Sequence, residues 1–168
     1  MRTSSTRLIS LVVLALLAGC GDSGTDEGPL GISREHGSST TGGPVRVGEF
    51  FVIGVSPPKN HGDEAVFESL EPAEPDRARG LEMRYAAVTV KYRCAVGSAK
   101  GWPPKQCVGL LRPVKGYRYG TQRALLLVGA RAGQPGTRLI PAFRLRYRVG
   151  DRSYMAVYEQ GMELRVTR

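Results

Sequence analysis

Short apolar runs rich in Val, Ile, Leu, Phe and Tyr alternate with Gly and Pro clusters from about residue 46 to the C-terminus. No stretch of useful length repeats its apolar residues with the period of an amphipathic helix. Many short strands separated by turn residues are typical of an all-β sandwich or barrel. We predict strands at residues 47–55, 64–70, 81–94, 107–113, 123–131, 139–149, 152–159 and 162–167.

One hairpin near the C-terminus can be predicted in register. Gly150-Asp151 suits a two-residue turn, because Gly at the first central position tolerates a positive φ. Side chains alternate along a strand, so one face pairs Tyr147 with Tyr154, Leu145 with Ala156, and Phe143 with Tyr158. The opposite face carries Arg144, Arg146 and Arg148 against Val157, Met155 and Ser153.

The apolar alternation in 81–94 changes phase halfway. Leu81 and Tyr85 share one face, whereas Val88 and Val90 fall on the other. An inserted residue near Ala86-Ala87 would turn both halves toward one core, so we expect a β-bulge there. The alternative is a strand that passes from one sheet to another.

The N-terminus resembles the signal of bacterial lipoproteins. Arg2 and Arg7 precede an apolar run at 8–18 that is too short to span a bilayer. The run ends in Leu17-Ala18-Gly19-Cys20, which is similar to a lipobox. The resemblance implies that residues 1–19 are cleaved. It also implies that the sulfur of Cys20 carries a diacylglycerol and that the mature chain bears fatty acyl groups such as palmitate.

Residues 20–45 contain much Gly, Ser and Thr and few large apolar groups, so we expect a flexible linker there. The folded domain is then 46–168. Lipidation of Cys20 would leave Cys94 and Cys107 as a pair, and export makes a disulfide between them possible. The expected localisation is the cell membrane, lipid-anchored on its extracytoplasmic side.

Charge is distributed unevenly along the chain. The net charge is +9, and removal of Arg2 and Arg7 with the signal lowers it to +7. From Met83 to Gly150 there is no Asp or Glu but there are 14 basic residues. Such asymmetry suggests contact with an anionic surface. The alternative is that the early acidic strands pair with the later basic ones inside the sheet.

Two clusters mix aromatic and basic residues. Lys100, Trp102 and Lys105 lie inside the predicted disulfide loop, and Tyr117 and Tyr119 follow the predicted strand 107–113. Aromatic side chains amid cations can stack on ligands or lie at membrane interfaces. The alternative, for Trp102 and also for the two tyrosines, is a cap on the end of the core. The candidate binding residues are Arg144, Arg146, Arg148, Lys100, Trp102, Lys105, Tyr117 and Tyr119.

The sequence offers little for catalysis or metal binding. The mature chain has only His36, in the linker, and His61, in a turn, and both usable cysteines are expected to be oxidised. No His, Cys or Met residues lie at ligand spacing. We therefore expect no enzyme, cofactor or metal, and export makes nucleic acid a poor partner.

Two short segments resemble immunoglobulin-like domains. Asn60-His61-Gly62-Asp63 is similar to a turn of bacterial immunoglobulin-like modules, and Tyr92-Arg93-Cys94 is similar to the Tyr-x-Cys of their strand F. The partner cysteine here lies downstream, so the bond would tie neighbouring segments and would not pin two sheets. The expected fold is a single antiparallel, immunoglobulin-like β-sandwich of about seven or eight strands.

These observations predict a non-catalytic, lipid-anchored module that binds at the cell envelope. The basic face would contact an anionic lipid or wall polymer. The alternative is an accessory or structural subunit that binds another envelope protein through apolar contacts, for which Met155 and Val157 are candidates.

Overall fold

The computed structural model describes residues 28–31, 39–90, 94 and 96–168. In this part the chain is all-β, as expected, with three short 3-10 helices: η1 (Gly28–Leu30), η3 (Pro75–Ala78) and η4 (Lys105–Cys107). None of the described helices is long and apolar enough to cross a membrane. Cys20, the predicted signal at 1–19 and His36 lie outside the described residues.

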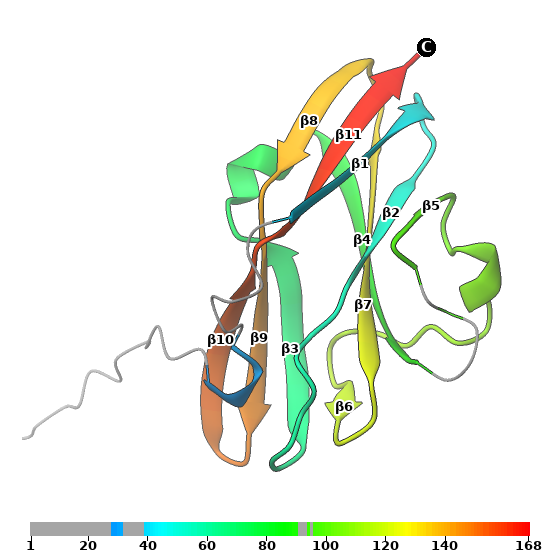
Figure 1. The fold of residues 1–168 in the computed structure, drawn as a ribbon. Helices are drawn as coiled ribbons and strands as arrows, with labels where there is room; N and C mark the ends of the chain where they lie inside the picture. The colour runs from blue at the N-terminus through cyan, green and yellow to red at the C-terminus, as the bar shows by residue number, and fades with distance from the viewer. Residues whose placement is uncertain (1–27, 32–38, 91–93, 95) are drawn as a thin grey trace, which may run out of the picture.

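Eleven strands in the described residues form three sheets (Figure 1). The β9 sheet has the order β10-β9-β3-β6, from β10 (Arg152–Tyr158), β9 (Phe143–Val149), β3 (Ala65–Pro72) and β6 (Arg118–Tyr119). The β7 sheet has the order β4-β7-β2-β5, from β4 (Leu81–Thr89), β7 (Ala124–Ala132), β2 (Phe51–Val55) and β5 (Ser98–Lys100). The β11 sheet consists of β1 (Ser39–Arg46), β11 (Gln160–Thr167) and β8 (Gly136–Ile140).

The β9 and β7 sheets enclose the main hydrophobic core between them. Alternate side chains of each strand enter it, as the period of a strand requires. The β9 sheet contributes Phe67, Phe143, Leu145 and Tyr147, and the β7 sheet contributes Phe51, Ile53, Leu126 and Val128. Val45, Met162 and Leu164 of the β11 sheet close one end. The expected antiparallel sandwich is confirmed, with the parallel pair β1–β11 as an addition.

The predicted C-terminal hairpin is confirmed in every pair. Tyr147 lies opposite Tyr154, Leu145 opposite Ala156 and Phe143 opposite Tyr158. Gly150 has a φ of 57°, which the turn requires. Turn chemistry and apolar alternation agreed on one register, and such agreement specifies a hairpin strongly.

The bulge expected near Ala86-Ala87 is wrong. β4 pairs with β7 without a register shift from Leu81 to Thr89. The change of phase has another cause, because both faces of this strand are covered. Ala87 packs in the main core, whereas Val88 packs in a second cluster on the outer face of the β7 sheet.

Two further strand predictions need correction. The region 107–113 holds the end of η4 and turns, and only Arg112 makes an isolated bridge, to Ala87. Gly109 has a φ of 79° there, which interrupts an extended strand. The predicted strand 139–149 is divided into β8 and β9, which belong to different sheets. Pro141 lies between them and cannot donate to a ladder.

The flexible linker was expected to extend to residue 45, but part of that range is folded. Ser39–Arg46 forms β1, which pairs in parallel with all of β11. Leu30, in η1, is fully buried in the main core. The physical reason is that β11 has an open edge and the sandwich has an open side, and these N-terminal residues cover them. The folded domain therefore begins before residue 46.

Candidate functional site

The arginine row, Arg144, Arg146 and Arg148, lies on the outer face of the β9 sheet. Arg144 and Arg146 face Glu71 at N–O distances of 3.3 and 3.8 Å, and Arg148 faces Glu68 at 3.9 Å. Both acids belong to β3, the neighbouring strand. On this face, the acidic residues of an early strand therefore pair with the basic residues of a later one, which is the alternative that the sequence leaves open. A row with acidic partners along its length is a poor electrostatic contact for an anion.

The register of β3 explains this pairing. The ladder between β3 and β9 shifts between Phe67 and Ser69, so Glu68 is an extra residue on β3. A bulge re-aims side chains locally, and here Glu68 comes within ion-pair distance of Arg148. Arg118 is likewise paired with Glu64, at 2.7 Å.

Met155 and Val157 are only partly exposed. The Nη1 of Arg144 lies 4.0 Å from the Met155 sulfur, and its Nη2 donates to the Ala73 carbonyl at 3.3 Å. The arginine side chains thus cover part of the apolar surface on which the accessory-subunit alternative relied. In the part of the chain that the structure describes, the large apolar residues that are exposed are Val47, Val108, Leu110 and Leu139.

The predicted disulfide between Cys94 and Cys107 is present. Both residues are buried in the second cluster, with Val52, Val88 and Leu127 of the β7 sheet. We call Cys94 and residues 96–112 the disulfide segment. It covers the outer face of the β7 sheet (Figure 1), so the bond does not pin two sheets together.

Trp102 packs on this outer face as a cap. A Cβ on Gly129 would meet the Trp102 ring at 2.5 Å, so the indole lies directly on the backbone of β7. The Phe50 ring is 6.3 Å away, centroid to centroid. Trp102 therefore packs as a cap on the sheet, the alternative to a ligand contact, and its indole is only partly exposed.

A charged cluster continues from Trp102 along the β7 sheet. The guanidinium groups of Arg84 and Arg131 lie 4.8 and 5.0 Å from the Phe50 ring centroid. Both donate to Glu82, with Nε–Oε distances of 3.1 and 2.6 Å. Burial opposes the charged form of Glu82, but the two arginines outweigh it and lower the pKa of this carboxyl below its ordinary value.

The disulfide segment carries three cations with no acidic partner in the described residues. Lys100, Lys105 and Arg112 are exposed, and none of them makes an ion pair there. Two exposed apolar residues stand between Lys105 and Arg112 in the chain: Val108 is 63% exposed and Leu110 is 42% exposed. This combination of free positive charge and exposed apolar side chains is absent from the arginine row.

Tyr117 and Tyr119 belong to the core. They are 8% and 1% exposed and pack against Phe67. The Tyr117 hydroxyl lies 2.7 Å from Thr89 Oγ1, and the Tyr119 hydroxyl donates to the Pro58 carbonyl at 2.7 Å. Burial raises the pKa of Tyr119. Neither ring is free to stack on an external ligand, which corrects their assignment to a contact surface.

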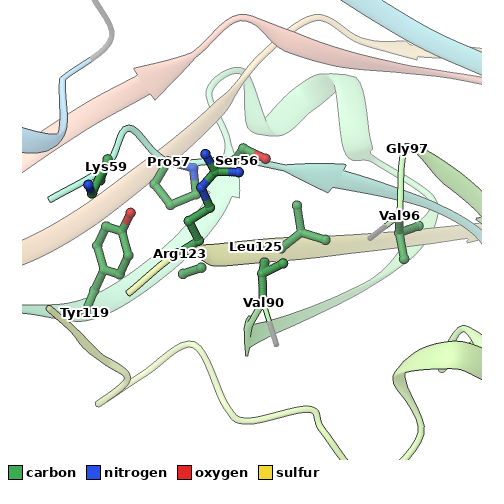
Figure 2. A pocket seen from close by; sticks show the side chains of 10 residues that line it. Ser56, Pro57, Lys59, Val90, Val96, Gly97, Tyr119, Arg123 and Leu125 are labelled. Atoms are coloured by element: carbon green, nitrogen blue, oxygen red, sulfur yellow. The ribbon is translucent and has the colours of Figure 1, made fainter. Parts of the chain in front are cut away.

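A pocket of about 480 Å³ that the sequence did not indicate opens beside Tyr119. Figure 2 shows Lys59 and Arg123 toward one end and Val90, Leu125 and Val96 toward the other. No ion pair of Lys59 or Arg123 occurs within the described ranges. Cations beside an apolar wall could hold a small anion with an apolar body.

Histidine, cysteine and carboxylate side chains do not gather into a metal site in the described part of the chain. It contains no cluster of three or more His, Cys, Asp or Glu placed to hold a metal ion. His61 is exposed in the turn after Asn60. The two described cysteines are consumed by the disulfide.

Comparison with known proteins adds little to this picture. No family model matches the chain, and no curated protein matches it. Among solved structures, the ambient-temperature fimbriae adhesin AtfE of Proteus mirabilis is similar over 73% of this chain and 74% of the adhesin chain, with 9% identity and a TM-score of 0.25. A similarity of that size carries no argument about function, and the all-β class follows from the sheets themselves.

Proposed function

We propose that the mature chain is an extracytoplasmic lipoprotein, anchored through acylated Cys20, that binds an anionic component of the cell envelope without catalysis. The contact surface is the exposed part of the disulfide segment. Lys100 and Lys105 come from the aromatic-basic cluster of the sequence, and Arg112 joins them.

The observation that carries this proposal is the set of unpaired cations on the disulfide segment. The arginine row faces acids on β3, so its field is largely cancelled. Lys100, Lys105 and Arg112 make no ion pair in the described residues, although Glu49 lines the same hollow as Lys100. Val108 and Leu110 add exposed apolar surface. Cations next to apolar side chains suit an anionic surface with some apolar character.

The disulfide supports an exported location. Structural disulfides persist in oxidising compartments and are rare in the cytosol. Outside a bacterial membrane, the anions available are lipid headgroups and wall polymers. Both present phosphate or carboxylate groups, so the same cations would serve either.

Vesicle and polymer binding test the proposal. The protein is the mature chain with Cys20→Ser, in a salt series, against anionic vesicles, neutral vesicles and isolated anionic wall polymer. Each basic residue near an anionic membrane contributes about 1 kcal/mol. The triple variant Lys100→Gln, Lys105→Gln, Arg112→Gln should therefore bind about 100-fold more weakly.

The matched control removes the same charge elsewhere, with Arg79→Gln, Arg138→Gln and Arg152→Gln, all of them exposed. We expect this variant to lose much less affinity. Equal losses of affinity in the two triple variants would mean that binding depends on net charge alone and would contradict a contact surface on the disulfide segment. Salt-insensitive binding to anionic and neutral vesicles alike would contradict an electrostatic contact.

The exposed Val108 and Leu110 favour a second candidate, a protein partner held by apolar contacts. Such a complex should survive high salt and weaken when Val108→Ser and Leu110→Ser are combined. A partner that co-purifies in high salt, and is lost with this double variant, would favour this candidate over the first.

A further inference from the structure

The described N-terminal segment Gly28–Leu30 is held in the open side of the sandwich by tyrosines of the C-terminal hairpin. Leu30 is 0% exposed and belongs to the main core. Its backbone N–H donates to the Tyr147 hydroxyl at 2.9 Å, and its carbonyl accepts from the Tyr158 hydroxyl at 3.1 Å. Figure 1 shows η1 beside β9 and β10.

The site fits this peptide closely. Gly28 has a φ of 57°, and a Cβ there would meet Tyr154 Cδ1 at 2.4 Å and the Tyr147 hydroxyl at 2.5 Å. The rings of Tyr147 and Tyr154 are stacked, with centroids 5.4 Å apart. Only glycine suits both the backbone conformation and the space.

Long-range recognition explains why η1 exists at all. A single 3-10 turn has almost no stability of its own, because forming one turn fixes several dihedral angles for one hydrogen bond. Here both polar backbone groups of Leu30 are satisfied by side chains more than 100 residues away. The leucine side chain occupies the core that the same tyrosines line.

We propose that Gly28–Leu30 is a clip in cis that fixes where the anchoring chain leaves the domain, and so limits how far the domain can move from the membrane. This inference rests on the proposed acylation of Cys20. From Cys20 to Gly28 the chain has eight residues, which span at most about 28 Å when fully extended. Without the clip, the next attachment in the described residues is β1, which begins at Ser39, and a chain tethered there could reach about 65 Å.

The clip therefore keeps the β9–β10 edge close to the anchoring membrane. Figure 1 shows the disulfide segment on the far side of the β7 sheet from η1. The proposed contact surface and η1 thus lie on different sides of the domain, which leaves that surface accessible to a partner while the clip is closed.

Hydrogen exchange tests the clip without any lipid, on the mature chain with Cys20→Ser. We expect the Leu30 amide to be protected, and protection to be lost in Leu30→Asp and reduced in Tyr147→Phe, which removes the acceptor. The control Thr40→Asp adds the same charge at an exposed position of β1 and should keep protection. An unprotected Leu30 amide in the parent chain would overturn the clip. So would protection that rises with protein concentration, because the peptide would then come from a second copy.

Energy transfer tests the limit on reach, with acylated chain on vesicles that contain an acceptor lipid and a donor dye on Ser153→Cys. We expect Leu30→Asp to lower the transfer efficiency and Thr40→Asp to leave it unchanged. Equal efficiency in Leu30→Asp and the parent would overturn the proposal. Mass spectrometry of the native chain distinguishes the two ideas: an unmodified Cys20 contradicts the anchored function, whereas the exchange experiment still decides whether the clip forms.

Discussion

A single asparagine organises the turn between β2 and β3. Asn60 is 1% exposed. Apart from tyrosines and cysteines, it is the one polar residue that is buried in the described part of the chain. Its Nδ2 donates to the carbonyls of Asp63 and Tyr119 at 2.9 and 2.8 Å, and its Oδ1 accepts from the Gly62 N–H at 3.0 Å. One amide thus satisfies three backbone groups and joins this turn to β6.

Asn60→Ala should destabilise the domain by about 2–3 kcal/mol, because it leaves buried backbone groups without partners. The neighbouring His61→Ala, at an exposed position, should change the free energy of unfolding by less than about 0.5 kcal/mol. Urea unfolding of both variants checks this. Equal, small effects would mean that water replaces the amide.

At Gly129 a glycine is required because the Trp102 ring lies against the backbone, although the φ of this residue is not positive. Gly129→Ala places a methyl group 2.5 Å from the Trp102 ring, and overpacking of this kind costs about 1–3 kcal/mol. Gly133→Ala is the control, since no atom lies within 4 Å of its Cβ position. We expect thermal unfolding to show a loss for Gly129→Ala alone. An unchanged midpoint would mean that Trp102 moves away freely.

At the scale of elements, β4 and β7 are covered on both faces. The inner face meets the main core and the outer face meets the disulfide segment. This two-sided burial explains the near-continuous apolar run of β7 from Ala124 to Val128, since fully buried strands lose the alternation of half-exposed ones. Burial also affects the titration of Tyr85, a residue of β4 that is partly buried against the main core.

Burial raises the pKa of Tyr85 to about 12, and the nearby charge of Glu71 adds to the shift. Because the fold favours the neutral phenol, the stability from this group is complete below pH 10 and is lost as the pH rises from about 10 toward 12. Unfolding experiments at increasing pH should show this decline. Tyr85→Phe should flatten it, and an unchanged slope in that variant would contradict the assignment.

At the scale of the molecule, the first and the last strand of the described residues lie side by side. β1 lies parallel to β11 along its whole length, from Ser39 opposite Gln160 to Arg46 opposite Thr167. The Thr167 hydroxyl also donates to the Val45 carbonyl at 3.3 Å. The first strand is therefore held by contacts with residues more than 100 positions away in the sequence.

A chain that begins at Val47, near the domain boundary expected from the sequence, should therefore be less stable than one that begins at Gly28. It loses the β1–β11 ladder, buried Val45 and the Leu30 contacts. Thermal unfolding of the two chains measures the difference, and a chain that begins at Ser39 separates the part due to β1 from the part due to η1. Equal midpoints for all three would show that the N-terminal segments add nothing.

Local patterns in the sequence were enough to predict the all-β class, the hairpin around Gly150 and the pairing of Cys94 with Cys107. Each depends on local chemistry: strand period, turn conformation, or the number of cysteines available. The sequence also placed Lys100 and Lys105 in the disulfide loop, where both are exposed; that they bind a ligand stays a prediction.

The folded arrangement was needed to see which charged side chains are paired and which segments are folded. Arg144 and Glu71 are distant in sequence, so their pairing depends on strand order and on the bulge in β3. A bulge in β4 was expected because the order of apolar residues along the chain does not show that both faces of this strand are buried, one in each hydrophobic cluster. Gly28–Leu30 looked like linker because its stability comes from tyrosines more than 100 residues away. These features arise from contacts between distant segments, and a local pattern does not record them.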